Sequence, residues 1–291
     1  MTTVLTTPDA MRSWSRTQHR GGRRIGFVPT MGALHDGHLA LIDATRRMSD
    51  AVVVSIFVNP LQFDRPRDFD GYPRPLDDDL GRCREAGVHA VYAPTAATMY
   101  PVDFDTRVVP GSLAERIEGA ARPGHYEGVT TVVTKLFGAV RPDVAAFGEK
   151  DFQQLALIRR LNLDLDLGAE IVAVPTVREP DGVAMSSRNR RLDPAARTAA
   201  RGLPRALRLA AAAARSSGAT PADVLDAVAN AIGAEPSARL DRADLVDAVT
   251  LRDLDHLHEC AAGDARLLIA VEIAGIRLID NIDPIDPPED L

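Results

Sequence analysis

The chain has 291 residues, of which 45% are hydrophobic and 26% charged, as is typical of a folded protein long enough for two domains. Its 34 basic and 41 acidic residues give a formal net charge of −7, which disfavours nucleic acid as a partner. The two cysteines lack any motif spacing, the N-terminus lacks a signal pattern, and no apolar run approaches the roughly 18 residues that span a membrane, so we expect a cytoplasmic protein with free thiols.

Short apolar runs alternate with helical periodicity from residue 23 to about residue 177, a pattern typical of parallel βαβ units. The run from Ala51 to Val58 is apolar on both faces except at Ser55, which indicates a central strand covered by helices on both sides. We therefore expect a Rossmann-like α/β domain with a doubly wound parallel sheet over residues 1–177. Strands are predicted at residues 24–28, 51–58, 90–93, 144–147 and 171–175, and helices after His38 and at about 76–86, 128–140 and 151–161.

The composition changes after Arg178, which predicts a smaller α+β C-terminal domain over residues 178–291. Residues 195–232 are alanine-rich and favour helices. They are divided near residue 220, where Thr220 can cap and Pro221 can open a second helix. Further β-rich segments are predicted at residues 245–251, 266–273 and 277–279, and the tail at 283–290 is expected to fray.

The turn Pro29-Thr-Met-Gly-Ala-Leu-His35-Asp-Gly-His38 joins the first predicted strand to a helix. Its two imidazoles fall at the N-terminal end of that helix, where unpaired N–H groups and the helix dipole stabilise an anion. Gly32 and Gly37 allow close approach of the backbone, and histidine donors can follow charge that develops on a phosphate. Two alternatives stay open: the imidazoles cap the helix, or they bind zinc, although no nearby residue supplies the usual third ligand.

Two further loops carry cations. Phe147-Gly-Glu-Lys150-Asp151-Phe-Gln-Gln154 repeats the order of strand, glycine and helix, and such loops share the carboxyl edge of a doubly wound sheet. Lys150 can neutralise phosphate, Asp151 either caps its helix or holds a ribose, and Gln154 can grip a hydroxyl or carboxylate. Met185-Ser-Ser-Arg188-Asn189 predicts either a mobile phosphate clamp or an ordinary solvated loop.

Three other polar stretches are less specific. Asn59 and Gln62, after the central strand, offer neutral groups that suit a small polar substrate. The acids at 77–79 open a helix, where their interaction with the helix dipole favours a structural role over magnesium or amine binding. Arg122-Pro-Gly-His125 either lines a substrate entrance or forms a subunit contact.

Taken together and in this order, these segments resemble the pantothenate synthetase (pantoate–β-alanine ligase) family of the HIGH-type nucleotidyltransferase superfamily. The segments that carry the resemblance are Pro29–Leu39, Val58–Phe63, Tyr72-Pro-Arg, Phe147–Leu155 and Met185–Asn189. The resemblance implies that ATP, with Mg²⁺, and pantoate form a pantoyl adenylate and pyrophosphate, after which β-alanine displaces AMP to give pantothenate for the coenzyme A pathway. It also implies a homodimer.

The resemblance further implies the site residues. The implied catalytic residues are His38, the proton donor, together with His35, Lys150 and Arg188, and no residue is a metal ligand. Pantoate is held by Gln62 and Gln154, and β-alanine by Gln62 and Tyr72. ATP is bound by Met31, Gly32, Ala33, Leu34, His35, Asp36, Gly37, His38, Gly148, Glu149, Lys150, Asp151, Val177, Met185, Ser186, Ser187 and Arg188.

The sequence departs from the family pattern at two positions and leaves two rival functions. Phe152 replaces a common tyrosine, and Arg191 stands where an aromatic residue often follows Ser-Ser-Arg-Asn. One rival is a related nucleotidyltransferase with a phosphorylated acceptor, against which the neutral Gln62 and Gln154 argue. The other is a catalytically silent nucleotide-binding module, which would need fewer convergent charges.

Overall fold

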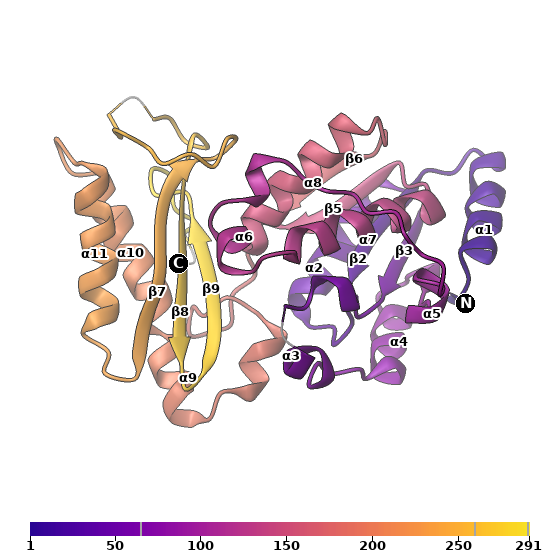
Figure 1. Cartoon of the computed structure of the whole chain (residues 1–291), viewed down its shortest axis with the longest axis horizontal. Coiled ribbons are helices and arrows are strands. Elements are labelled where there is room, and N and C mark those ends of the chain that lie inside the picture. Colours follow the sequence, from indigo (N-terminus) through magenta and orange to yellow (C-terminus); the bar gives the residue numbers. More distant parts are fainter. Residues whose placement is uncertain (65, 259, 290) are drawn as a thin grey trace. The chain divides into compact units, whose positions relative to one another are not determined.

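The computed structural model describes residues 1–64, 66–258, 260–289 and 291, which form two compact units (Figure 1). Unit 1 comprises Met1–Gly148 and Gln153–Val174, and unit 2 comprises Glu149–Phe152 and Pro175–Leu291. The chain passes finally into unit 2 after Val174, near the expected boundary at 177. The sequence did not predict that Glu149–Phe152 belongs to unit 2.

Unit 1 is built on a six-stranded parallel sheet with the order β1-β4-β3-β2-β5-β6. The doubly wound α/β prediction is confirmed. β3 pairs with β2 on one side and β4 on the other, so the expected central strand is also confirmed. The strands are β1 (Thr3–Leu5), β2 (Ile25–Thr30), β3 (Ala51–Ile56), β4 (Ala90–Tyr92), β5 (Val144–Gly148) and β6 (Glu170–Val174).

Helices cover both faces of this sheet (Figure 1). Alternate residues of each strand point to opposite faces, so Phe27 packs with α1, α7 and α8, whereas Val28 packs with α2 and α4. The longer helices are α1 (Pro8–Arg20), α2 (Asp36–Met48), α4 (Leu76–Glu85), α7 (His125–Val140) and α8 (Phe152–Asp164). The shorter elements of unit 1 are α3 (Pro66–Asp70), α5 (Ala96–Met99), α6 (Glu118–Ala121) and the 3₁₀ segments η1 (Pro60–Gln62) and η2 (Ser112–Ala114). The 3₁₀ segment η3 (Glu149–Asp151) belongs to unit 2.

The N-terminal strand and helix, β1 and α1, are not among the predicted elements. The helix carries a local start signal, because the hydroxyl of Thr7 accepts the N–H of Ala10 at 3.2 Å and Pro8 occupies the first turn. β1 has only three residues and gains its backbone partners from β4, which lies far along the chain. Tertiary pairing therefore creates this edge of the sheet.

Unit 2 contains an antiparallel sheet with the order β7-β8-β9, and helices α10 and α11 lie beside it (Figure 1). The predicted helix start is confirmed: the hydroxyl of Thr220 accepts the N–H of Asp223 at 3.3 Å, and Pro221 follows. The elements are η4 (Ser187–Arg191), α9 (Pro194–Ala200), α10 (Gly202–Ala214), α11 (Pro221–Gly233), β7 (Ala238–Asp247), β8 (Ala265–Ile273) and β9 (Ile276–Ile282).

Two expectations for unit 2 were wrong in their bounds. β7 begins at Ala238 rather than near residue 245, since its first half alternates exposed charges that conceal the strand pattern. The tail does not fray from its start. Asp283 and Pro284 are buried, and the Asp283 carboxylate accepts the N–H of Gly263 at 2.6 Å.

Candidate active site

The turn after β2 has a strained backbone that a buried carboxylate holds in place. Gly32 and Ala33 both have positive φ, of 79° and 51°. The carboxylate of Asp79, 2% exposed in the first turn of α4, accepts the N–H groups of Ala33 and Leu34 at 2.8 and 2.7 Å. A Cβ at Gly32 would lie 2.8 Å from Asp79 Oδ2, so the turn requires glycine there. The structural interpretation of the acidic run is therefore supported for Asp79.

His35 and His38 lie at the N-terminus of α2, as predicted. Nδ1 of His38 accepts the backbone N–H of His35 at 3.2 Å, and the two ring centroids are 4.1 Å apart. An accepting Nδ1 is unprotonated, so the neutral ring carries its proton on Nε2. Capping and phosphate binding are therefore compatible, because they use different nitrogens of the same ring.

This turn stands at the switch point of the sheet. The strand order proceeds from β2 through β3 to β4 on one side, and β5 then pairs with β2 on the other. In doubly wound folds, ligands bind at the carboxyl ends of the strands where the order reverses. The carboxyl end of β2 leads into the histidine turn, and that of β5 is Gly148.

Gln62 is held at the end of η1 by three residues of unit 1. Its side chain is 9% exposed, accepts from Asn59 Nδ2 at 3.0 Å and donates to Met31 Sδ at 3.1 Å. Its backbone carbonyl accepts from His125 Nδ1 at 2.7 Å. Asn59 is 1% exposed and also donates to the Gly128 carbonyl at 3.0 Å, so it positions Gln62 instead of facing a substrate.

The turn at Arg122–His125 thus has a role that the sequence did not predict. Arg122 Nη2 also donates to the Gln62 carbonyl, at 3.3 Å, and Arg122 Nε contacts Asp64 at 3.1 Å. The helix that follows is brought close to η1, because a Cβ on Gly128 would lie 2.4 Å from the Leu61 carbonyl oxygen. Arg122, His125 and Gly128 therefore support Gln62.

Adjacent glutamines on α8 differ in their contacts. Gln153, 2% exposed, donates to the carbonyls of Leu113 and Arg116 and accepts the N–H of Glu118. Gln154 is half-buried and makes no hydrogen bond to the described residues through its amide, which leaves that amide for a ligand. Tyr72, the other predicted substrate residue, is half-buried with its ring 5.7 Å from that of Phe63.

Unit 2 brings two predicted phosphate-binding segments into one pocket. Lys150 lines it together with Ser186, Arg188 and Asn189, and residues of β9 complete the wall. The Lys150 side chain is 17% exposed and its Nζ lies 3.9 Å from Asp151 Oδ2. This pocket gathers three cations, those of Lys150, Arg188 and Arg277, with the hydroxyl of Ser186, and such groups suit phosphate oxygens. Its volume is about 10 Å³, which is room for about one water molecule.

The segment that contains Arg188 is cross-linked by hydrogen bonds. The Met185 N–H donates to the Val177 carbonyl at 2.9 Å, so these two predicted ATP residues are neighbours. Asn189 Nδ2 donates to Glu179 Oε1 and to the Ala184 carbonyl, at 2.7 and 3.0 Å. These hydrogen bonds distinguish the segment from an ordinary solvated loop, and its action as a mobile phosphate clamp stays a prediction. Of the two departures, Phe152 packs its ring beneath the Arg266 guanidinium, 4.4 Å away, and Arg191 is exposed.

Both cysteines are free thiols, as expected. Burial raises the pKa of the Cys83 thiol to about 12, and the nearby Asp79 carboxylate adds to the shift. A neutral, buried thiol is a poor nucleophile, so Cys83 contributes packing.

Among the described residues, no group of three His, Cys, Asp or Glu side chains is arranged to hold a metal ion, and none of the described helices is long and apolar enough to cross a membrane.

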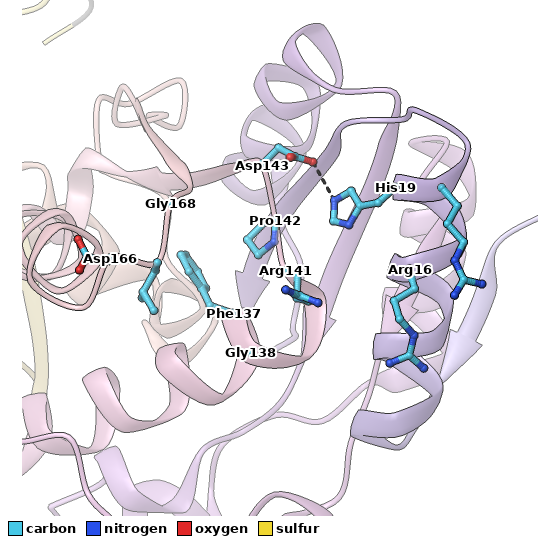
Figure 2. Close-up of a pocket in the computed structure, with 11 residues that line it drawn as sticks. Arg16, His19, Phe137, Gly138, Arg141, Pro142, Asp143, Asp166 and Gly168 are labelled. Carbon is cyan, nitrogen blue, oxygen red and sulfur yellow. Dashed lines mark hydrogen bonds and ion pairs between the residues drawn. The ribbon is translucent and has the colours of Figure 1, made fainter.

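A pocket of about 600 Å³ lies at the amino ends of the strands of the unit 1 sheet, opposite to the histidine turn (Figure 2). Arg16 and Arg141 line it, and His19 Nε2 contacts Asp143 Oδ2 at 3.1 Å, directly before β5 begins. These basic groups stand near the C-terminal ends of α1 and α7, where the helix dipoles favour cations. The dipoles therefore explain the charge of this pocket without a ligand.

The fold and the site define a nucleotide-binding α/β enzyme, with a histidine turn at the switch point and a cation-lined pocket in its second unit. Comparison with known proteins gives the family. The chain matches the model of the pantoate-beta-alanine ligase family over residues 3–283. The chain therefore belongs to the pantoate–β-alanine ligase family, and it is an enzyme of the ATP-dependent carbon–nitrogen ligase class.

Named relatives agree over almost the whole chain. The pantothenate synthetase of Acidothermus cellulolyticus is 51% identical over 258 residues, which cover 89% of this chain and 84% of the relative. That of Mycobacterium avium is 50% identical over 279 residues, or 96% and 88% of the two chains.

Solved structures show the same fold. The pantothenate synthetase of Thermus thermophilus superposes with a TM-score of 0.90 at 44% identity, over 98% of this chain and 100% of that one. The pantoate-beta-alanine ligase of Francisella tularensis, complexed with beta-gamma ATP and beta-alanine, has a TM-score of 0.81 at 30% identity, over 99% and 100% of the two chains.

Proposed function

We propose that this ligase makes pantothenate in two steps. A carboxylate oxygen of pantoate attacks the α-phosphorus of ATP, so that pyrophosphate leaves and a pantoyl adenylate remains. The amine of β-alanine then attacks the pantoyl carbonyl, forms the amide bond, loses a proton and releases AMP. The first step converts an unreactive carboxylate into a mixed anhydride, which needs oriented substrates and charge stabilisation more than a covalent nucleophile.

The observation that carries this proposal is the histidine turn at the switch point. Its strained backbone directs the N-terminus of α2 and two imidazoles at one place, which suits a triphosphate. Nε2–H of His38 is the donor that we assign to the phosphate under attack, because Nδ1 is already engaged by the His35 N–H. His35, Lys150 and Arg188 complete the groups that stabilise the developing charge.

The remaining ATP contacts come from four segments. The first turn of α2 supplies backbone donors around Gly37, whereas the N–H groups of Gly32, Ala33 and Leu34 already donate to Thr30 and Asp79. Ser186 and Ser187 supply hydroxyls beside Arg188. Val177, joined to Met185 by a backbone hydrogen bond, is assigned to the adenine. The full ATP set consists of Met31–His38, Gly148–Asp151, Val177 and Met185–Arg188.

Gln62 and Gln154 are assigned to pantoate, and Gln62 with Tyr72 to β-alanine. Neutral amides suit the hydroxyls and single carboxylate of pantoate, whereas a phosphorylated acceptor would favour cations there. The contacts of Asn59, Met31 and His125 hold Gln62 in one orientation before a substrate binds. The Francisella complex with beta-gamma ATP and beta-alanine supports binding of both compounds by a protein of this fold.

Mg²⁺ enters this scheme as the companion of ATP. The ion prefers oxygen ligands and keeps several waters, so phosphate oxygens can supply most of its coordination. Exposed carboxylates on the first turns of α2 and α4, those of Asp36, Asp77 and Asp78, are donors of a suitable kind. When bound, the ion would neutralise the triphosphate.

We further propose that the enzyme acts in the cytoplasm as a homodimer.

Isotope exchange tests the proposed order of steps. Exchange of labelled pyrophosphate into ATP should require pantoate, and release of AMP should require β-alanine as well. Exchange that proceeds equally well without pantoate would contradict the adenylation step. A phosphorylated acceptor that replaces pantoate would instead favour the related nucleotidyltransferase function.

A further inference from the structure

Two cations from distant parts of the chain share one pocket of unit 2, and the structure shows what keeps them there. Lys150 belongs to a four-residue segment, Glu149–Phe152, that packs with unit 2 although its neighbours in sequence pack with unit 1. Arg188 follows the loop at residues 178–184. Both segments are hydrogen-bonded to consecutive residues of β9, Asp280 and Asn281.

Asn281 holds the backbone that carries Lys150. Its side chain is almost fully buried, and Nδ2 donates to the carbonyls of Glu149 and Lys150 at 3.0 and 2.8 Å. Oδ1 accepts from Arg266 Nε at 2.7 Å, which fixes which end of the amide faces the two carbonyls. Both amide protons are therefore used on the Lys150 segment.

Arg266 secures the same segment from β8. Its Nη2 lies 3.2 Å from Glu149 Oε2, and its guanidinium lies over the Phe152 ring with 4.4 Å between the guanidinium carbon and the ring centroid. The Arg266 side chain is 12% exposed. The segment is thus held on both sides of Lys150, which leaves its side chain free to line the pocket.

Asp280 anchors the segment before Arg188. Its carboxylate receives two hydrogen bonds from Arg178, at 2.7 and 3.1 Å, and the two side chains are 1% and 3% exposed. Arg178 Nη1 also donates to the Gly182 carbonyl at 3.0 Å, and Arg178 bridges to Ala184. Asp280 therefore sets the position of the chain that leads into Met185–Arg188.

We propose that Asp280 and Asn281 are positioning residues for the phosphate contacts of ATP. One strand thereby fixes the separation of the two backbone segments that carry Lys150 and Arg188. This inference rests on the proposed assignment of Lys150 and Arg188 to the phosphates. A purely structural function of Asn281 would affect stability alone, whereas a positioning function must act through Lys150.

Asn281→Asp tests the donors most directly. The variant keeps an oxygen for Arg266 but places a second acceptor against the Glu149 and Lys150 carbonyls, so the Lys150 segment is released. We expect the Kd for ATP, measured by calorimetry, to rise by about tenfold or more. The KM for β-alanine should not change, and Glu272→Gln, a change in an exposed cross-strand pair of the same sheet, should leave ATP binding unaffected.

A double-mutant cycle with Lys150→Ala decides between the two explanations. If Asn281 acts through Lys150, Asn281→Asp should cause little further loss of ATP affinity in the Lys150→Ala background, yet should cause its full loss in the His38→Asn background. Equal losses in both backgrounds, or an unchanged Kd in a folded Asn281→Asp protein, would overturn the proposal. If Asn281→Asp does not fold, as judged by circular dichroism, Arg266→Lys is used in the same cycle.

The single variant Lys150→Ala distinguishes failure of the assignment of Lys150 to the phosphates from failure of the positioning role of Asn281. A normal affinity for ATP in Lys150→Ala would refute the assignment of Lys150 to the phosphates, whatever Asn281 does. Weaker binding in Lys150→Ala, together with a normal Kd in a folded Asn281→Asp, would retain that assignment and refute the positioning role.

Discussion

The carboxylate of Asp79 fixes the backbone just before the two histidines, because it accepts the N–H groups of Ala33 and Leu34 at 2.8 and 2.7 Å. The acceptor lies on α4 and the donors on the turn after β2, so helix packing determines the shape of the turn. A buried donor without a partner is costly, which makes this contact important for both stability and geometry.

Replacement of Asp79 by alanine is expected to destabilise the protein and weaken ATP binding together. Each buried N–H left unpaired costs about 1–3 kcal/mol, and the turn loses the contact that fixes its positive-φ residues. Denaturant unfolding and ATP calorimetry measure the two effects. Glu85→Ala, an exposed position at the other end of the same helix, serves as the control and should change neither by much. Full ATP affinity in Asp79→Ala would contradict the positioning of the turn by this carboxylate.

His38 is expected to contribute to catalysis through Nε2 and to helix capping through Nδ1. His38→Ala should fold and lower the rate of adenylation by roughly a hundredfold or more, the scale of one positioned donor. His38→Asn retains an acceptor near the position of Nδ1, so it should lose the same rate while keeping its melting temperature. Pyrophosphate exchange and thermal unfolding measure the two properties.

His38→Gln provides the complementary variant. Its amide can reach the position of Nε2 but leaves the His35 N–H without its acceptor, which costs about 1 kcal/mol for a helix cap. We expect a smaller loss of rate and a larger loss of stability than in His38→Asn. The reverse order would favour capping as the only role of this histidine.

Two glycines of α7 should respond in opposite directions to alanine. A Cβ on Gly128 would meet the backbone of Leu61 and Gln62 within 2.6 Å, so Gly128→Ala must displace η1. We expect a raised KM for pantoate and a loss of stability. Gly138→Ala meets nothing within 4 Å and should stabilise the same helix by about 0.4–1 kcal/mol. Steady-state kinetics and denaturant unfolding measure the two effects. The same change in both variants would contradict the close contact between Gly128 and η1 as the cause.

Acid should weaken the loop that precedes Arg188. Burial opposes ionisation of Asp181, but hydrogen bonds from Arg197 and from the Val183 N–H outweigh it and lower the pKa of this carboxyl below its ordinary value. The ionised group therefore stabilises the fold at pH values above the ordinary carboxyl range. This contribution is lost as the pH falls through the lowered pKa of the folded state.

Asp181→Asn checks this pH dependence. The variant should be less stable than the parent at pH 7, and the difference in unfolding free energy should shrink as the pH falls below about 4. Asp226→Asn, an exposed position on α11, should show a small difference at every pH. A constant difference for Asp181→Asn between pH 7 and pH 3 would exclude its ionisation as the source of stability.

The sequence alone determined the class of fold and the local motifs on which the proposed site is built. Parallel strands covered on both faces produce apolar runs such as Ala51–Ile56, which the sequence shows directly. The glycine and histidine pattern of residues 29–38 is local, so it can be recognised without the structure. The cap at Thr220 and Pro221 is local in the same way.

Tertiary structure decided which side chains support the site. Asp79 with Leu34, His125 with Gln62 and Asn281 with Lys150 are partners separated by many residues, and the sequence shows no spacing that links them. The charged first half of β7 and the three residues of β1 likewise become strands only beside their partners. Local patterns record backbone periodicity and helix ends, whereas buried hydrogen bonds between distant segments exist only after the chain has packed.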